Sequence, residues 1–252
     1  MALTIGDAVP DFVAASTKGE IRFHKFLDDG PGWTMLFSHP RDFTPVCTTE
    51  LGEFAKHKSA FDALGVQLVA LSCDTASDHA EWCKDIEAFK GAPVDFAIID
   101  DSDRTLATRF RMLDPDEKDE SKLPVPVRSV FFIGPDKRVR ATICYPPLVG
   151  RNVPELLRVI RALQLGDAHP VATPVNWQPG DRVMIQPSLS DEEAAARFPG
   201  YTKHEVPSGK GYIRMTDDPS VPTTAPADAP ELAASAAASG AAAGASAGAG
   251  ST

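Results

Sequence analysis

Apolar residues in the first two thirds of the chain follow two alternating patterns. Short continuous apolar runs are typical of strands buried on both faces, and the segments between them carry apolar residues every three or four positions, as amphipathic helices do. The predicted strands are 33–37, 66–71, 94–99, 127–133 and 139–145, preceded by a hairpin of 9–13 with 21–23. The predicted helices are 45–64, 77–90, 102–110 and a long one capped by Asn152. This alternation predicts an α/β fold around a central sheet.

The pattern changes beyond Pro170. A proline-rich extended segment leads to a predicted strand at 183–187, and Ser190 opens a helix to Phe198 with a capping box. A final hairpin turns at 207–211. This part is poor in large apolar residues, so we expect a small α+β domain that does not fold alone.

From about Ser220 the chain consists largely of Ala, Gly, Ser and Pro. Such a composition cannot bury enough apolar surface to offset the entropy lost on ordering. We therefore predict a first domain at 1–168, a small domain at 169–217 and a disordered tail at 218–252. An Ala-rich helix at 231–237 is the competing interpretation, which the intervening glycines disfavour.

Composition excludes several classes of protein. The formal net charge is −10, and the absence of a Lys/Arg cluster argues against nucleic-acid binding. No apolar run approaches the ~20 residues of a membrane span, and the N-terminus lacks the basic and apolar regions of a secretory signal. The 4 cysteines are too scattered for a disulfide framework, so we expect a reducing compartment, most simply the cytoplasm.

Cys47 is the candidate centre of chemistry, because it lies where a core strand turns into a helix. A thiol with a pKa near ~8.5 is only about 3% ionised at neutral pH, and the free N–H groups of a helix start favour the thiolate. Thr44, one turn earlier, can place its hydroxyl beside the sulfur, and Pro40 can shield the sulfur from water. A buried cysteine is often only a small hydrophobe, but Pro, Thr and Cys together in a strand-to-helix turn favour a functional site.

Several separate motifs carry a resemblance to a known family. The pattern Pro40-x-x-x-Thr44-x-x-Cys47 resembles the active-site motif of peroxiredoxins, and HPRDFTPVCTTEL is similar to the one-cysteine, peroxiredoxin-6-type subfamily. Further similar segments are IIDD (98–101), MLDPDEKDE (112–120), FIGPDK (132–137), YPPLVGRN (145–152) and PVNWQPGD (174–181). The resemblance covers residues 3–216. It implies a thioredoxin-like fold with a small C-terminal dimerisation domain, and hence a homodimer.

The resemblance also implies an activity. It indicates a thiol-dependent peroxidase that reduces hydrogen peroxide and organic hydroperoxides, in which the Cys47 thiolate becomes a sulfenic acid. Arg128 and Thr44 are expected to hold the peroxide and stabilise the leaving oxygen. Arg128 begins an apolar strand, where a charge needs a strong reason to exist. A strand-end side chain that reaches solvent is its competing interpretation.

Four residues are expected to support this chemistry. The resemblance implies that Glu50 orients Arg128, that Arg151 is a second arginine of the site and that His39 lies beside the sulfur. Pro40 is expected to shield the sulfur from water. For Arg151 the alternative is a surface charge at a helix start. For His39 the alternative is a purely structural histidine.

The sulfenic acid is expected to be reduced by an external thiol, glutathione or a thioredoxin-like protein. The sequence has no second Val-Cys-Pro segment of the kind that two-cysteine relatives carry. Cys73, Cys83 and Cys144 are interpreted as core residues, although each is available in principle to resolve the sulfenic acid. A peroxide sensor or a redox-regulated holdase chaperone that uses Cys47 is the alternative function.

Other chemistry is not predicted. His39 and Cys47 have no further metal ligands at a recognisable spacing, and no cofactor or metal is expected. Mammalian members of the subfamily carry a lipase-like serine motif before the core strand, but residues 28–33 here contain no serine. We therefore expect no phospholipase activity by that route.

Overall fold

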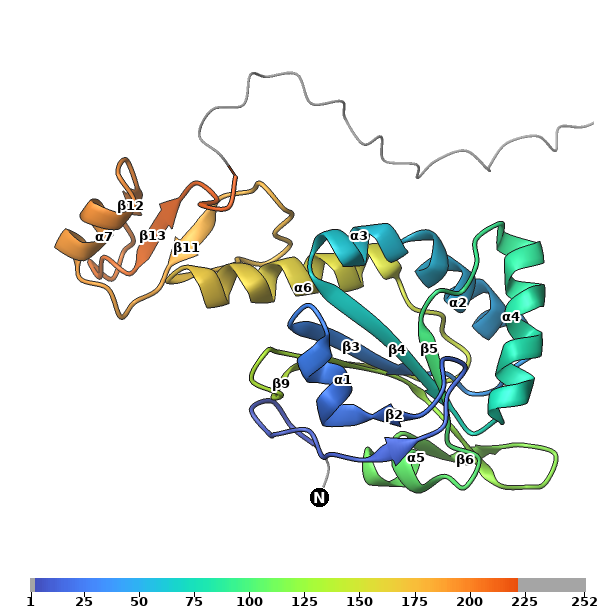
Figure 1. The fold of residues 1–252 in the computed structure, drawn as a ribbon. Helices are drawn as coiled ribbons and strands as arrows, with labels where there is room; N and C mark the ends of the chain where they lie inside the picture. Colours follow the sequence, from blue (N-terminus) through green and yellow to red (C-terminus); the bar gives the residue numbers. More distant parts are fainter. Residues whose placement is uncertain (1–2, 222–252) are drawn as a thin grey trace, which may run out of the picture.

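Figure 1 shows a computed structural model that describes residues 3–221, built around a sheet with the strand order β5-β4-β3-β8-β9. The strands are β3 (Trp33–Ser38), β4 (Val66–Ser72), β5 (Ala97–Asp100), β8 (Arg128–Ile133) and β9 (Val139–Tyr145). β3, β4 and β5 run parallel, whereas β8 is antiparallel to β3 and β9 is antiparallel to β8. The predicted α/β fold around a central sheet is confirmed.

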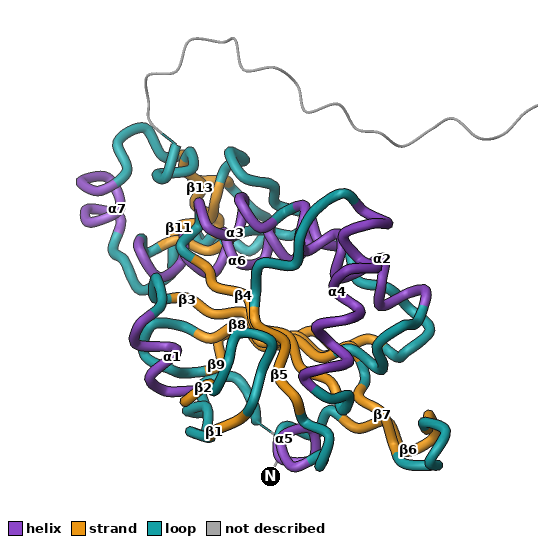
Figure 2. The backbone as a smooth tube through the Cα atoms, turned by 45° about the vertical axis from the view of Figure 1, so that its right-hand side comes forward, coloured by secondary structure: helices purple, strands orange, loops and turns teal. Residues whose placement is uncertain are grey.

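Helices cover both faces of this sheet (Figures 1 and 2). They are α1 (Phe23–Asp29), α2 (Pro45–Lys56), α3 (Lys58–Ala63), α4 (Ala76–Lys90), α5 (Thr105–Arg109) and α6 (Val153–Ala168). Phe37 of β3 packs in a core with side chains of α2, α4 and α6, while its neighbour Leu36 packs in a second core with α1 and α5. β3 is buried along its whole length because both faces are covered. No helix within residues 3–221 is long and apolar enough to cross a membrane.

Two short hairpins flank the sheet. β1 (Val13–Ala14) pairs with β2 (Ile21–Arg22), which confirms the predicted opening hairpin with shorter strands. β6 (Leu113–Lys118) pairs with β7 (Pro124–Pro126). The sequence did not predict this second hairpin, because the exposed β6 carries almost no apolar alternation.

A second, four-stranded sheet follows α6, with the order β10-β11-β13-β12. Its elements are β10 (Val171–Ala172), β11 (Val183–Ile185), α7 (Asp191–Arg197), β12 (Thr202–His204) and β13 (Ile213–Thr216). Leu165 of α6 packs with Trp177 and Phe198 in a separate small core. The predicted capping box of α7 and the final hairpin are confirmed. The domain boundary at residue 168 stays a prediction.

Three local predictions were wrong for reasons of packing. Phe23, predicted as the end of a strand, instead begins α1, in which Phe23 and Leu27 are buried one helical turn apart. The helix predicted over 45–64 is divided at His57 into α2 and α3, so the chain changes direction there. The spacing of Trp82, Ile86 and Phe89 predicts one apolar face of α4, but Phe89 is 65% exposed.

The predicted tail lies outside the described residues from 222 onward. Its first residues belong to the fold, since Asp218 is buried and accepts hydrogen bonds from the backbone N–H groups of Gly180 (3.2 Å) and Ser220 (2.9 Å). The ordered chain therefore extends past the predicted boundary at 217.

Gly52 allows α2 to pass close to α4. A Cβ at this position would lie 2.8 Å from Cβ and 2.3 Å from Cγ of Lys90. We expect Gly52→Ala to lower the free energy of unfolding by about 1–3 kcal/mol, because the crowding outweighs the better helix propensity of alanine. Urea unfolding followed by circular dichroism measures this change.

Gly166→Ala in α6 is the matched control. The nearest atom to its Cβ would be the Val171 carbonyl oxygen at 3.7 Å, an ordinary contact. This substitution should raise the free energy of unfolding by up to ~1 kcal/mol. Equal effects of the two substitutions would contradict close packing of α2 against α4.

Candidate active site

The candidate site begins where β3 ends and α2 starts. Thr44 is the N-cap of α2 and Pro45 occupies its first position, so Cys47 lies in the first turn, as predicted. Proline fits there because the N–H that it lacks would have no helical partner. The sulfur is enclosed, since Cys47 is 0% exposed, and it lies at the end of the helix that favours an anion.

Arg128, the first residue of β8, meets Cys47 from the neighbouring strand. Its Nη1 donates to the Cys47 sulfur at 3.3 Å, and its Nε and Nη2 donate to the Pro147 carbonyl oxygen at 3.0 and 2.5 Å. The side chain is 3% exposed, so Arg128 does not reach solvent. β8 runs antiparallel to β3, and its first residue therefore lies beside the end of β3 from which α2 departs.

Glu50 joins Arg128 and Arg151 into one buried ionic group. It accepts from Nη1 of Arg128 at 2.6 Å and from Nε, Nη2 and the backbone N–H of Arg151 at 2.9, 2.8 and 2.7 Å. Arg151 also donates from Nη1 to the carbonyl oxygens of Ser38 (3.0 Å) and Ser129 (3.3 Å). Every side chain of this group is at most 4% exposed.

The two guanidinium groups keep the Glu50 carboxylate charged. Burial is the largest single effect and would raise the pKa of Glu50. The charges and hydrogen bonds of Arg151, followed by the charge of Arg128, outweigh it and hold the pKa below its ordinary value. With Glu50 and a Cys47 thiolate both anionic, the two arginines balance the charge of the site.

Thr44 and His39 make other contacts than the sequence predicted. The Thr44 hydroxyl donates to the Arg41 carbonyl oxygen at 2.8 Å, and no hydrogen bond joins it to the sulfur among the described residues. His39 is buried, and its Nε2 lies 2.7 Å from Oδ1 of Asp42; its place beside the sulfur stays a prediction. Pro40 is buried in the loop between them. The structure thus brings together Cys47, Arg128, Glu50 and Arg151.

Sequence reasoning missed three contributors to this region. The Pro147 carbonyl oxygen fixes the Arg128 guanidinium, and Asp42 and His79 form a buried hydrogen bond at 2.6 Å. The YPPLVGRN motif contains Pro147, but a carbonyl acceptor leaves no signature in side-chain identity. His79 lies on α4, and only the fold brings it to Asp42.

The remaining cysteines differ from Cys47 in their surroundings. Cys73 and Cys83 are half-buried, and burial, the largest effect, raises the pKa of Cys73 to about 12 and that of Cys83 to about 11. Cys144 is exposed, so its assignment to the core was wrong. It pairs with Ser129 on β8, the neighbour of Arg128, and therefore points to the sheet face opposite Arg128 and Cys47.

The buried ionic group predicts a large loss of stability on neutralisation of Glu50. We expect Glu50→Gln to lower the free energy of unfolding by about 3–5 kcal/mol, because two buried guanidinium groups lose their counter-charge. The matched control is Glu53→Gln, one turn on, whose side chain is 39% exposed and lies 3.9 Å from Lys90. That substitution should change stability by at most ~1 kcal/mol.

The same carboxylate predicts a dependence on pH. The pKa of Glu50 in the folded protein lies below its ordinary value. The stabilisation that Glu50 gives the fold is therefore complete at a pH above the ordinary pKa, and it is lost as the pH falls through the folded pKa. The free energy of unfolding of the wild type, measured with denaturant, should therefore fall more steeply toward acid pH than that of Glu50→Gln. Parallel plots of unfolding free energy against pH for the two proteins would exclude an ion-paired Glu50 carboxylate.

Comparisons with known proteins agree with this geometry. The AhpC/TSA family profile matches residues 5–142, and the profile of the C-terminal domain of 1-Cys peroxiredoxin matches residues 162–200. Peroxiredoxin-6 of Rattus norvegicus is 53% identical over 222 residues, which cover 86% of this chain and 98% of the rat protein.

Two solved structures have the same fold. A Cys-to-Ser mutant of peroxiredoxin 6 from Arenicola marina matches with a TM-score of 0.84 and 48% identity, over 87% of this chain and 100% of that one. A yeast mitochondrial 1-Cys peroxiredoxin matches with a TM-score of 0.76 and 44% identity, over 85% and 99% of the two chains. The predicted thioredoxin-like fold is confirmed. With its cysteine at a helix start, its paired arginines and these similarities along most of its length, the chain belongs to the 1-Cys peroxiredoxins of the AhpC/TSA family.

Proposed function

We propose that the protein is a thiol-dependent peroxidase that reduces hydrogen peroxide and organic hydroperoxides at Cys47. The observation that carries this proposal is the 3.3 Å contact between the Arg128 guanidinium and the Cys47 sulfur at the start of α2. Family membership and sequence identity to peroxiredoxin-6 support it along most of the chain.

Ionisation of the thiol alone does not make a fast peroxidase. Complete ionisation raises the thiolate fraction only ~30-fold over a free thiol at pH 7, and a lower thiol pKa also lowers nucleophilicity. Further acceleration must come from donors aimed at the charge that develops along the breaking O–O bond, where one donor is worth ~10²–10³ in rate. Arg128 is such a donor because Glu50 and Pro147 fix its guanidinium beside the sulfur.

The chemical step is a two-electron transfer. The Cys47 thiolate attacks the terminal oxygen of the hydroperoxide, so an S–O bond forms while the O–O bond breaks. The sulfur is oxidised to sulfenic acid, and the leaving alkoxide or hydroxide takes up a proton to become an alcohol or water. Arg128 stabilises the leaving oxygen, and Pro40 shields the sulfur. The Thr44 hydroxyl, which donates to the Arg41 carbonyl oxygen, holds the peroxide through its acceptor lone pairs.

An external thiol completes the cycle. The first thiol condenses with the sulfenic acid to a mixed disulfide and releases water, and a second thiol releases Cys47 and an external disulfide. The solved yeast relative is described with a resolving mechanism through the glutathione and thioredoxin systems, which supports the same class of reductant here. Cys144 faces the opposite side of the sheet, and Cys73 and Cys83 are protonated at neutral pH.

Peroxide turnover with an external thiol tests this function. Cys47→Ser should abolish turnover, and Arg128→Lys should lower kcat/KM by about 10²–10³, because one ammonium group cannot contact the sulfur, Glu50 and the Pro147 carbonyl oxygen as the guanidinium does. Arg138→Lys, at a side chain that is 54% exposed, is the matched control and should retain wild-type activity. Turnover in Cys47→Ser would refute the proposal.

Mass spectrometry under non-reducing conditions tests the one-cysteine cycle separately. After one equivalent of peroxide, the wild type should carry a single added oxygen on Cys47 and no internal disulfide. An internal disulfide to any of the other three cysteines would show that the chain resolves itself.

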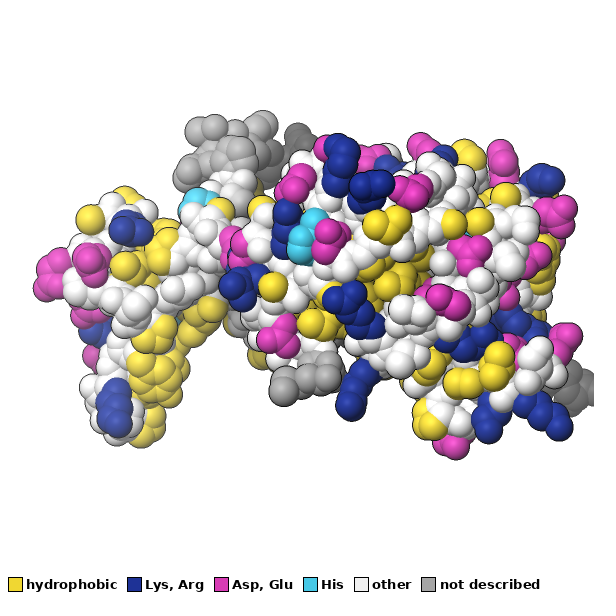
Figure 3. All heavy atoms as spheres, turned by 60° about the horizontal axis from the view of Figure 1, so that its bottom comes forward, with side chains coloured by type: hydrophobic (Ala, Val, Ile, Leu, Met, Phe, Trp, Pro, Cys, Tyr) yellow, Lys and Arg dark blue, Asp and Glu magenta, His cyan; other side chains and the backbone are white. Residues whose placement is uncertain are grey.

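We further propose that the protein is a homodimer. β9 is an edge strand of the central sheet, and the neighbouring Leu148 is 84% exposed. Tyr212, next to β13, is 59% exposed, and hydrophobic side chains gather on the projecting C-terminal sheet (Figure 3). Sedimentation equilibrium at micromolar concentration should give twice the mass of one chain. A single-chain mass would contradict the dimer.

A further inference from the structure

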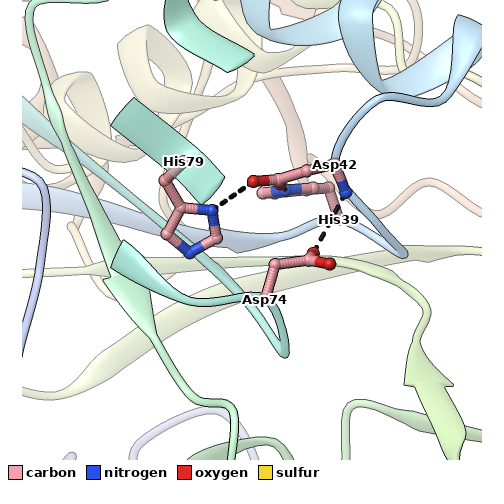
Figure 4. Close-up of side chains that lie close together, drawn as sticks. All are labelled: His39, Asp42, Asp74 and His79. Atoms are coloured by element: carbon pink, nitrogen blue, oxygen red, sulfur yellow. Dashed lines mark hydrogen bonds and ion pairs between the residues drawn. The ribbon is translucent and has the colours of Figure 1, made fainter. Parts of the chain in front are cut away.

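A second buried polar cluster lies next to the candidate active site and is not part of the peroxide chemistry described above. It contains His39, Asp42, Asp74 and His79 (Figure 4). The Asp42 carboxylate lies between two histidines, with Oδ1 at 2.7 Å from Nε2 of His39 and Oδ2 at 2.6 Å from Nδ1 of His79. The side chains of His39 and His79 are 0% exposed and that of Asp42 is 1% exposed.

The contacts of His79 determine its protonation. Its Nδ1 faces the Asp42 carboxylate, and its Nε2 lies 3.1 Å from the Ile99 carbonyl oxygen. Both partners are acceptors only, so both ring nitrogens must carry protons, which makes His79 an imidazolium cation. His39 differs, since its Nε2 donates to Asp42 and its buried Nδ1 has no partner among the described residues.

The charges around His79 agree with this assignment. The acidic groups that face it are Asp42, Asp74 at the end of β4 and Asp100 at the end of β5. Burial is the largest effect and would lower the pKa of His79. The hydrogen bond and the charge of Asp42, with the charge of Asp74, outweigh it and raise the pKa above its ordinary value.

The spacing of the cluster favours shared protons over a shared metal ion. Two ligands of one zinc ion, each ~2.0–2.1 Å from the metal at a tetrahedral angle, lie about 3.3 Å apart. The two separations between imidazole nitrogen and carboxylate oxygen are 2.6 and 2.7 Å, which are hydrogen-bond distances. The cluster is therefore an ionic hydrogen-bond network.

This network fastens the loop that carries Pro40 and Thr44. The backbone N–H of Asp42 donates to Oδ2 of Asp74 at 3.0 Å, and the hydroxyl of Ser72 donates to the same oxygen at 2.6 Å. The adjoining Phe43 has a φ of 53°, a conformation that is strained for an aromatic residue and needs support from its surroundings. Asp42 thus ties the loop to β4 and, through His79, to α4.

We propose that His79 is a positioning residue of the peroxidase site: as a buried imidazolium paired with Asp42, it holds the loop of residues 39–44 against the start of α2. The proposal rests on the function proposed above, because the loop positions Pro40 and Thr44 for the peroxide. Loss of the cation removes an opposite charge from the buried Asp42 carboxylate and so weakens the attachment of the loop to α4.

Nitrogen-15 NMR of the histidine rings tests the protonation states in the wild type. At pH 7, both ring nitrogens of His79 should have the chemical shifts of protonated nitrogens. A neutral His79 at pH 7 would overturn the proposal whatever the activity of the enzyme, and this measurement needs no variant that might misfold.

Kinetics test the positioning role. His79→Gln keeps a donor for Asp42 without a charge and should lower kcat/KM for peroxide by between ~10- and ~100-fold, the usual penalty for a misplaced site. His57→Gln is the matched control at a half-buried histidine that contacts Glu53, and it should leave turnover unchanged.

A double-mutant cycle with Asp42→Asn completes the test. Because His79 acts through Asp42, the double variant should be no slower than Asp42→Asn alone. Additive losses, or wild-type kcat/KM in His79→Gln, would refute the positioning role. An inactive wild type would instead refute the peroxidase function, so the two failures are distinguishable.

Discussion

The carboxylate of Glu50 is the constraint on which the site depends. Two guanidinium groups beneath the protein surface would be strongly destabilising without a counter-charge, and Glu50 supplies it to both. Arg151 occupies both carboxylate oxygens in a fork, and Nη1 of Arg128 is shared between Glu50 and the Cys47 sulfur. The same ion pairs that stabilise the buried charges also aim a donor at the reactive atom.

The order of the strands makes this arrangement possible. The carboxyl end of β3 leads into α2, and β8 begins at that same end of the sheet because it runs antiparallel to β3. Residues 147–151 return from β9 to the same place, where they supply the Pro147 carbonyl and Arg151. Segments about a hundred residues apart in sequence thus meet at the first turn of one helix.

Surroundings, not residue type, separate the reactive thiol from the others. Cys47 is buried but faces a guanidinium and a helix start, so its anion has favourable partners. Cys73 and Cys83 are half-buried among apolar and acidic groups that oppose ionisation. The neighbouring pair of Asp42 and His79 follows the same principle, since each of these buried charges touches an opposite charge.

The sequence by itself determined the α/β architecture, the position of Cys47 at a helix start and the caps at Asn152 and Ser190, because these features arise from periodicity and from contacts within a few residues. It also indicated a role for Arg128, because a charged residue is unusual in an apolar strand.

Only the tertiary structure decided the partners of those side chains. The pairing of Glu50 with Arg151, the contact of His39 with Asp42 and the outward face of Cys144 depend on which strands are neighbours and on which face each residue lies. The break at His57 and the exposure of Phe89 likewise depend on packing between helices. Hydrogen bonds between distant segments leave no local pattern in a sequence, because they form only when the tertiary structure brings those segments together.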